Sequence, residues 1–591
     1  MKKRTRLWAA ALALMLLAGC GRTEPLPYPE PASSEPGKTI AYVPLDDRPD
    51  NVERVVYLAE SLGYALAMPD RDLYRTALDH QPLNGNGTQR GDPWALCQWV
   101  LEQEEAGCDR YILSLDQLLY GGLVASRSVE GFDIPLPGGG SVRSYSMLEE
   151  LLAALSAGGD NTVWLLDSIM RLAPTVGYEG GTLEDYNTIR AFGALPRRTL
   201  EGDALNLEDI DESYWWGPNG ESLRSQTKED GTYETALRHV RSRGRKMLLS
   251  YVVQDTLSKP GYENFRLLIG IDDSSLEDCI QKNEIAFLRQ GLRTGEDGRQ
   301  WDWLLSGVDD LAFKAVARLY LDETDWQGAS VSVTYTGGTE DRPACEYDFQ
   351  PLTETMAEHL EFFGLTEAGE GGDFAIEVLT QPEDGAQKDV YRKRLIENLQ
   401  GHARAGRPTV LIDASNGAFG ASVYDALVKD VELGRLTAYS GMLDMAIVTG
   451  TALSHGAARY AVLKNGENTG AMDRAWARTL ADSVIKDFCY KGVVRNDLLA
   501  YIRNELGGDP NNFWSPELDR EDLLRRLEKG MERETTGVIR NLERSRFLSA
   551  LGPEGPEEKR WGGIALENYR FPWDRAFEIG MDIRLGEFRD A

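Results

Sequence analysis

The sequence is poor in the residues that build metal centres and disulfide frameworks. It has five histidines and six cysteines among 591 residues, and no two cysteines follow a Cys-x-x-Cys spacing. Zinc sites need closely spaced Cys and His ligands, and disulfide-stabilised secreted domains are short and rich in cysteine. The pattern therefore argues against both a His/Cys zinc site and a disulfide framework.

Several sequence motifs are also missing. No P-loop and no Gly-x-Gly-x-x-Gly run follows an expected strand, and no Gly-x-Ser-x-Gly elbow stands between a strand and a helix. These absences give little support to nucleotide chemistry or to a serine nucleophile. The formal net charge of −31 repels polyanions at long range, so we expect no nucleic-acid partner.

Long apolar runs are lacking except at the N-terminus. There, four basic residues precede the apolar stretch Leu7–Ala18, and "LAGC" ends at Cys20. About 12 apolar residues are too few to span a bilayer, and the segment resembles a bacterial lipoprotein signal. The alternative is an uncleaved anchor with a chance cysteine. We expect a signal peptide at 1–19 and lipidation of Cys20, which gives an exported, extracytoplasmic protein anchored to a bacterial membrane by lipid.

The rest of the chain divides by composition and pattern. Residues 20–38 are rich in Pro, Glu and Ser and are typical of a disordered tether. After them, apolar β-branched runs alternate with amphipathic stretches, which predicts an α/β protein with parallel strands. The expected strands are 40–45, 64–68, 110–115, 162–166, 247–253, 267–271, 304–308, 329–335, 374–379, 409–412 and 436–439.

This pattern predicts three regions. Residues 39–325 form a barrel-like or doubly wound α/β domain with an insertion at 176–245, residues 326–470 form a Rossmann-like α/β domain, and residues 471–591 form a helical region. The amphipathic stretches expected to be helices are 51–62, 93–105, 145–157, 276–289 and 390–405.

Acidic residues recur where the expected strands end. In parallel α/β folds, functional sites gather at the carboxyl ends of the strands. A single aspartate there often caps the next helix, but the recurrence favours a shared site. The residues at these ends are Asp46, Asp47, Asp116, Asp167, Asp255, Asp272, Asp273, Asp309, Asp310 and Asp413, with Arg48, Arg127 and Arg171 as candidate partners.

Paired carboxylates are suited to glycoside hydrolysis. One protonates the leaving oxygen while the other attacks or activates water, and carboxylates also bind sugar hydroxyl groups. Tyr120, Trp215 and Trp216 are candidates for stacking on sugar faces, although core packing is an equal alternative. The same acids suit Mg²⁺ or Ca²⁺, but no EF-hand spacing is present and we expect no cofactor.

Four motifs together resemble the bacterial DUF4127 family. They are "YVPLDDRP", "LDQLLYGGLVASR", "IGIDDSS" and "SGVDD", in this order over residues 39–470. The family's name implies no activity, so the resemblance indicates which residues matter. Those residues are Asp46, Asp47, Arg48, Pro49, Asp116, Tyr120, Gly121, Gly122, Arg127, Asp272, Asp273, Asp309 and Asp310. The segment 439–456 departs from the family pattern, with Met442 and Leu443 where polar or aromatic groups are expected, which predicts altered specificity or reduced activity.

The leading hypothesis is an exported lipoprotein enzyme that hydrolyses a carbohydrate. Its catalytic acid and base or nucleophile are drawn from Asp272, Asp273, Asp309 and Asp310. The expected substrate-binding residues are Asp46, Asp47, Arg48, Asp116, Tyr120, Arg127 and Asp167. The alternatives are a non-catalytic lipoprotein that binds a sugar or another small ligand, and a metal-assisted hydrolase.

Overall fold

The computed structural model of the protein describes residues 38–128, 133–135, 140–200, 205–369, 371–442, 445–553 and 555–590. The expected signal peptide, the lipidation site at Cys20 and the tether up to residue 37 lie outside the described residues. In the part of the chain that the structure describes, no helix is both long and apolar enough to cross a membrane.

The first sheet has six parallel strands in the order β2-β1-β3-β6-β7-β8. The strands are β1 (Thr39–Val43), β2 (Ala65–Ala67), β3 (Arg110–Ser114), β6 (Thr162–Ile169), β7 (Phe265–Ile271) and β8 (Trp303–Ser306). Each overlaps an expected strand, and their residues are mostly buried. The predicted α/β class with a parallel N-terminal sheet is therefore confirmed.

Helices connect these strands. They are α2 (Glu53–Ser61), α3 (Pro93–Glu105), α4 (Leu115–Tyr120), α5 (Leu123–Ser126), α6 (Ser144–Ala157), α11 (Lys282–Gln290) and α12 (Leu311–Glu323). The start of α3 shows how the sequence sets a boundary. The Asp92 carboxylate accepts a hydrogen bond from the Ala95 amide at 3.0 Å, and Pro93 occupies the first helical position, where no amide hydrogen is needed.

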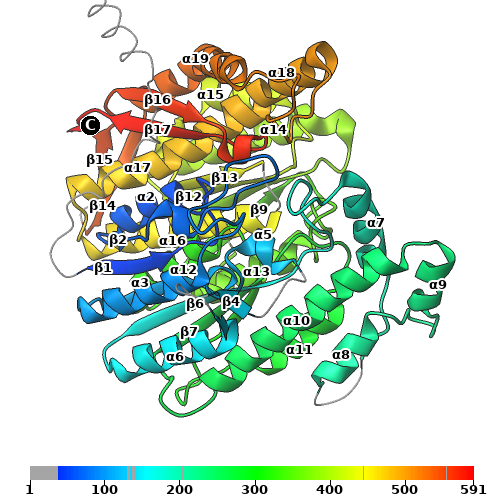
Figure 1. The fold of residues 1–591 in the computed structure, drawn as a ribbon. Helices are drawn as coiled ribbons and strands as arrows, with labels where there is room; N and C mark the ends of the chain where they lie inside the picture. Colours follow the sequence, from blue (N-terminus) through cyan, green and yellow to red (C-terminus); the bar gives the residue numbers. More distant parts are fainter. Residues whose placement is uncertain are drawn as a thin grey trace, which may run out of the picture. The chain divides into compact units, whose positions relative to one another are not determined.

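The insertion is helical, and one strand prediction beside it is wrong. It comprises α7 (Leu183–Ala194), α8 (Leu207–Ser213), α9 (Leu223–Glu229) and the first half of α10 (Tyr233–Leu257). The strand predicted at 247–253 lies inside α10, which packs beside α8 and α11 (Figure 1). Leu249, Val253 and Leu257 are buried at helical spacing while Leu248 and Tyr251 are exposed, so a short apolar run concealed a helical period.

The second sheet has five parallel strands in the order β10-β9-β11-β12-β13. The strands are β9 (Ala329–Thr336), β10 (Leu365–Glu367), β11 (Phe374–Thr380), β12 (Thr409–Ala414) and β13 (Ala438–Gly441). Their helices are α13 (Leu352–Phe362), α14 (Lys388–Arg404), α15 (Ala421–Asp430) and α16 (Met445–Asn465). This sheet matches the second α/β unit that the sequence predicts.

Both sheets share one connectivity. In each, the first strand along the chain lies between the second and the third, and later strands follow in order. In open parallel sheets, ligands bind outside the carboxyl ends of the strands where the order reverses. This point lies between β1 and β3 in the first sheet and between β9 and β11 in the second.

One hydrophobic core joins the two sheets. It contains Tyr42 and Trp164 from the first sheet, Val331 and Ile376 from the second, and much of α12 and α16. The Trp164 and Phe362 rings meet edge to face with centroids 6.4 Å apart. The boundary expected near residue 325 therefore separates two sheets that share a core.

The C-terminal region begins with helices and ends with strands. Its helices are α17 (Gly470–Ile485), the π-helix η4 (Lys486–Val494), α18 (Arg495–Ala500), the π-helix η5 (Tyr501–Leu506) and α19 (Arg520–Arg544). The antiparallel strands are β14 (Arg546–Gly552), β15 (Gly555–Arg560), β16 (Ile564–Arg570), β17 (Gly580–Leu585) and β18 (Arg589–Asp590). The sequence pattern did not predict these strands.

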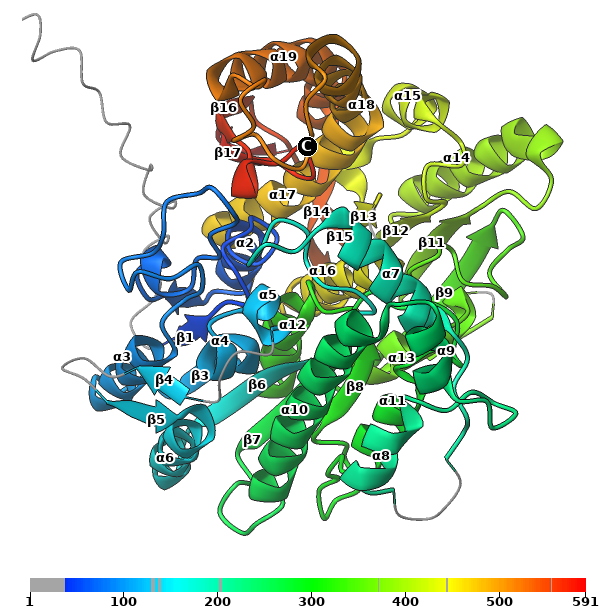
Figure 2. The same cartoon turned by 45° about the vertical axis from the view of Figure 1, so that its right-hand side comes forward.

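This region packs against the start of the first sheet. Helix α17 lies beside α2 in both views (Figures 1 and 2). Buried ion pairs link Asp482 to Arg54 at 3.6 Å and to Lys486 at 3.0 Å, and Lys486 also approaches Asp50 at 3.9 Å. The C-terminal region is thereby held close to the loop that follows β1.

Candidate functional site

The loop after β1 carries an arginine between two carboxylates. The Arg48 guanidinium donates to Asp46 through Nε at 2.9 Å and to both oxygens of Asp309 at 3.0 and 2.5 Å. Asp46 also accepts hydrogen bonds from the Arg48 amide and from Asn51, each at 3.0 Å. This fork-shaped, charge-assisted contact fixes the end of β1 to the loop after β8.

That contact shows that the strand-end loops converge. Four inter-strand steps separate β1 from β8 in the sheet order, which corresponds to about 19 Å across a flat sheet. The Arg48 and Asp309 side chains nevertheless lie within hydrogen-bonding distance. The loops therefore fold inward over the carboxyl edge, as the recurrent acids predict.

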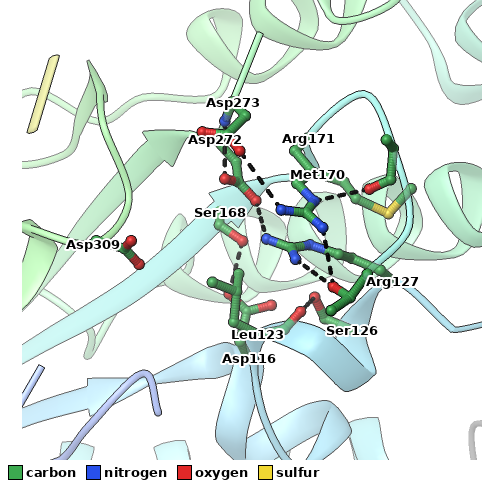
Figure 3. Close-up of polar contacts among 12 residues, drawn as sticks. Asp116, Leu123, Ser126, Arg127, Ser168, Met170, Arg171, Asp272, Asp273 and Asp309 are labelled. Carbon is green, nitrogen blue, oxygen red and sulfur yellow. Dashed lines mark hydrogen bonds and ion pairs between the residues drawn. The ribbon is translucent and has the colours of Figure 1, made fainter. Parts of the chain in front are cut away.

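Asp272 and Asp273 follow β7 and face two more arginines. Arg127 donates to Asp272 Oδ2 at 2.5 Å and to the Thr175 hydroxyl at 2.9 Å. Arg171 Nη1 lies 3.6 Å from Asp273 Oδ2. Figure 3 shows the two carboxylates opposite the two guanidinium groups, with Asp309 set apart from them at the left of the view.

A buried lysine lies beneath these groups. Lys246, from α10, contacts Asp116 directly and lies 3.8 Å from Asp167. Ser168 donates to Asp116 at 2.7 Å, and Ser250 donates to Asp167 at 2.6 Å. All three charged side chains are almost completely buried, so they support the floor of the site and do not reach solvent.

The carboxylates differ in electrostatic environment. Burial raises the pKa of Asp272, but Arg127 and Arg171 outweigh it, and the pKa lies below its usual value. Burial raises the pKa of Asp309 above its usual value, and Asp46 and Asp272 add to this effect, although Arg48 opposes it. Two neighbouring carboxyl groups with opposite shifts are the arrangement found for acid–base pairs.

Solvent access further divides the acids. The Asp309 and Asp273 side chains keep 23% and 27% of their surface exposed, and Asp272 keeps 10%. Asp46 and Asp116 are fully covered. Among the strand-end acids, Asp272, Asp273 and Asp309 therefore combine partial exposure with close arginine partners, whereas Asp46 and Asp116 lie covered beneath them.

Asp310 points away from the site. Its carboxylate is fully buried 3.0 Å from Lys314 Nζ, which also donates to the Ser306 carbonyl at 2.8 Å. Burial raises the Asp310 pKa to about 6 despite Lys314. Gly450 of α16 packs so closely that an added Cβ would lie 1.9 Å from Asp310 Oδ2. Asp310 is therefore enclosed by protein, and its partner Lys314 holds the end of β8 through the Ser306 carbonyl.

The aromatic residues at the site differ from those expected. Tyr120 and Trp215 are buried; Tyr120 lies under Arg245, and Trp215 packs on Phe192. Trp216, at 36% exposed, lies in the insertion. Burial raises the pKa of Tyr120, and the nearby Asp167 and Asp116 add to this effect, so this ring belongs to the buried floor of the site.

Three other aromatic residues lie beside the acids and are partly exposed. The Tyr186 ring lies 5.8 Å from the Arg171 guanidinium. Burial and Tyr186 raise the Tyr347 pKa to about 12, with a contribution from Asp273. The Trp573 indole donates to Asp47 at 2.9 Å, and Arg48 lies 4.8 Å from its ring centre.

The segment from Phe571 to Glu578 completes the site, and we did not predict it. Asp47 accepts hydrogen bonds from Arg71 at 2.6 Å and from the Thr76 amide at 3.2 Å as well as from Trp573. Trp573 has a φ of 54°, a left-handed conformation that is uncommon for a bulky residue. The sequence "FPWDRAFE" offers a turn signal but nothing that connects it to residue 47.

Arg575 and Glu578 of the same segment face inward. Arg575 donates to the Val176 carbonyl at 2.6 Å. Burial and the nearby Asp50 raise the Glu578 pKa to about 8, although Arg48 and Lys486 oppose the rise. Glu578 is therefore mostly protonated at neutral pH, which lowers the negative charge beneath Arg48.

Two other expected strand-end acids lie elsewhere. Asp255 is exposed on α10 and pairs with Lys259 at 3.1 Å. Asp413 is buried and accepts hydrogen bonds from Ser415 at 2.6 Å and Tyr424 at 2.8 Å. These contacts tie both acids to residues outside the cluster around Arg48 and Arg127.

The geometry also bears on metal and cavity sites. Within the described residues, no group of three or more His, Cys, Asp or Glu side chains is arranged to hold a metal ion.

A depression of about 740 Å³ lies between residues 257–263 and 293–301, which precede β7 and β8. It is therefore at the amino ends of those strands, away from the acids, and it gathers no comparable pair of carboxylates and arginines.

Comparison with known proteins gives one match. A family model described as "Protein of unknown function (DUF4127)" matches residues 40–194 and 254–582. No curated protein and no solved structure matches the chain. The matched ranges include the acids after β1, β3, β6, β7 and β8 as well as Trp573 and Glu578, and they omit the part of the chain that carries Lys246.

Proposed function

The chain belongs to the DUF4127 family, and from this premise we propose that it is a carbohydrate-active hydrolase. The family match extends over the strand-end acids and the C-terminal segment that meets them. Because the family's description names no activity, the proposal depends on the chemistry of the site. It includes export and lipid attachment at Cys20, as the N-terminal sequence favours.

The proposal rests mainly on two neighbouring carboxyl groups whose pKa values are shifted in opposite directions, upward for Asp309 and downward for Asp272. Asp309 is the group more ready to hold a proton, and Asp272 is the group more ready to remain ionised. Both side chains are held by arginines and both are partly exposed. A glycosidase needs one protonated and one ionised carboxyl group on either side of the scissile bond.

The roles follow from this bias. Asp309 donates its proton to the glycosidic oxygen as the bond from the anomeric carbon to that oxygen breaks. The Asp272 carboxylate acts on the anomeric carbon, either directly or by taking a proton from the attacking water. Arg48 and Arg127 hold the two carboxyl groups in place, and one water molecule is consumed for each bond cleaved.

The surrounding residues fit a sugar ligand. Asp273 accepts hydrogen bonds from hydroxyl groups, and Tyr186, Tyr347 and Trp573 offer partly exposed ring faces. Aromatic faces against the apolar side of a sugar, with carboxylates at its edge, bind by burial and hydrogen bonding together. Asp116, Asp167 and Lys246 position the floor from beneath.

The test is a digestion experiment with matched variants. The full chain and the variants Asp309→Asn and Asp272→Asn are incubated with a mixed pool of bacterial and host glycans, and products are read by mass spectrometry. Asp297→Asn is the control, because this aspartate is exposed and precedes β8, away from the site. Thermal unfolding of each variant verifies that it is folded. A parallel arm contains EDTA.

We expect new sugar fragments from the wild type and Asp297→Asn, and a loss of at least about 100-fold with either site variant. Equal products from all four proteins would refute the role of the two carboxylates. A glycan that is retained unchanged by the wild type and released by the variants would make the chain a binding protein. Loss of activity in EDTA, with recovery on adding Mg²⁺ or Ca²⁺, would make it a metal-assisted hydrolase.

A further inference from the structure

Three arginines from separate parts of the chain meet at the loop from Ala173 to Val176, and two of them, Arg127 and Arg171, also face Asp272 and Asp273. Arg127 follows α5, Arg171 follows β6, and Arg575 comes from the C-terminal segment. Within a chain of net charge −31, this corner of the site concentrates positive charge. Arg127 and Arg171 are labelled side by side in Figure 3.

Arg171 lies close enough to both Arg127 and Arg575 for their positive charges to repel. Burial and the neighbouring Arg127 lower the pKa of Arg171 below its usual value. Burial and Arg171 lower the pKa of Arg575 to about 10. Buried like charges are unfavourable unless counter-charges compensate them. Asp272 and Asp273 compensate Arg127 and Arg171, and Asp79 and Asp509 act on Arg575, but burial still leaves the pKa values of Arg171 and Arg575 below their usual values.

The three arginines also have N–H groups that protein acceptors do not fully use. The Nε atoms of Arg127 and Arg575 are buried and have no hydrogen-bond partner among the described residues. Arg171 Nη1 reaches Asp273 only at 3.6 Å, whereas its other nitrogens donate to the Ala173 and Pro174 carbonyls at 2.9 and 2.8 Å. Each arginine thus has donors that no protein group uses fully.

The loop from Ala173 to Val176 sets the orientation of all three guanidinium groups. Its carbonyls accept from Arg171 and, at Val176, from Arg575, and its Thr175 hydroxyl accepts from Arg127 and Arg171. These contacts restrict long side chains that otherwise lose entropy on binding. A preorganised group of donors is therefore available to a ligand.

We propose that Arg127, Arg171 and Arg575 bind an oxyanion group on the sugar substrate, so that the substrate class is acidic sugars. This rests on the proposed hydrolase function and names its substrate. Planar guanidinium groups suit carboxylate, sulfate and phosphate oxygens because two parallel N–H groups meet two oxygens. An acidic group there also supplies the missing counter-charge and orients the glycosidic bond toward Asp309.

The experiment separates recognition from catalysis. Binding of glucuronic acid, glucose 6-sulfate, glucose 6-phosphate and glucose to the full chain is measured by calorimetry at low and high salt. The variants are Arg575→Gln, Arg575→Lys and Arg171→Gln. Arg584→Gln is the matched control, since Arg584 is 71% exposed and pairs with Glu567. The three acidic sugars distinguish carboxylate, sulfate and phosphate as the bound group.

We expect at least one acidic sugar to bind more tightly than glucose, and its binding to weaken with salt. Arg575→Gln and Arg171→Gln weaken that binding by about 10-fold or more without changing glucose binding, and Arg575→Lys restores part of it. Arg584→Gln changes nothing. A purely structural role of Arg575 would weaken acidic and neutral sugars equally, and that result would overturn the proposal.

The other possible outcomes also test this proposal against the proposed hydrolase function. Equal binding of all four sugars, or binding of none, refutes the proposal that the three arginines bind an oxyanion group. Hydrolysis of neutral glycans without preference for acidic ones leaves the hydrolase proposal standing and refutes this one. Selective binding of acidic sugars with no hydrolysis of any acidic glycan supports recognition by the three arginines and refutes the hydrolase function.

Discussion

The buried pair of Asp310 and Lys314 makes the stability of the protein depend on pH in a direction opposite to that of most salt-bridged acids. Both side chains are fully buried, and Lys314 also ties α12 to the last residue of β8 by donating to the Ser306 carbonyl. The perturbation is the double variant Asp310→Asn/Lys314→Met, which removes both charges and keeps the side-chain volumes similar.

The magnitude follows from the pKa of Asp310. Its pKa is about 6 in the folded protein, against 3.8 for the unperturbed group. The folded state therefore binds this proton more tightly than the unfolded chain does, so the stabilisation is complete below about pH 3.8 and is lost as pH rises through 6. A difference of about 2 pKa units corresponds to about 3 kcal/mol, of which about 2 kcal/mol falls between pH 4 and pH 7.

The assay is urea unfolding of wild type and double variant at several pH values. We expect the wild type to lose about 2 kcal/mol relative to the double variant between pH 4 and pH 7. Other titrating groups occur in both proteins and cancel in the difference. In Lys314→Met alone, the carboxyl group loses its cation, so the loss extends above pH 7. Parallel stability curves, or a wild type that gains stability toward pH 7, would refute the reasoning.

Two predictions concern the site itself. Arg127→Met removes the main group that lowers the pKa of Asp272, so the acid limb of the pH–activity profile should move up by about 1–3 pH units. The control variant Arg584→Met should leave the acid limb in place. An acid limb that does not move in Arg127→Met would show that Asp272 is not the ionised carboxylate. Trp573→Phe removes the hydrogen bond to Asp47 and weakens the contact with Arg48, so the free energy of unfolding should fall by about 1–2 kcal/mol. No change in urea unfolding would contradict the docking of the C-terminal segment.

Much of the fold could be predicted because its strands are short apolar runs that end at polar residues. Ile40 to Val43 and Tyr111 to Ser114 are buried on both faces, so a continuous run is the expected signal of a parallel strand. The same signal failed at 247–253, where a run of similar length belongs to a helix. The C-terminal strands were missed because β15 and β16 face partly toward solvent and lack such runs.

The site was predictable in part for a related reason. Parallel strands bring their carboxyl ends to one edge, so Asp46, Asp272 and Asp309 could be expected to meet. The sequence did not show which acids are buried against a lysine, because Lys246 and Lys314 lie on helices whose packing cannot be predicted from a local pattern. Arg575 and Trp573 could not be found at all, since no one-dimensional signal links them to the first strand.

The contact between Trp573 and Asp47 joins residues 526 positions apart, and that between Arg48 and Asp309 joins residues 261 positions apart. During synthesis from the N-terminus, Asp46, Asp47, Asp272, Asp273 and Asp309 are therefore present long before Trp573 and Arg575. Contacts over such separations form late, because the intervening chain must first be ordered. A polypeptide interrupted before residue 573 would contain the acids of both sheets but neither Trp573 nor Arg575, so the finished site distinguishes full-length folded molecules from fragments.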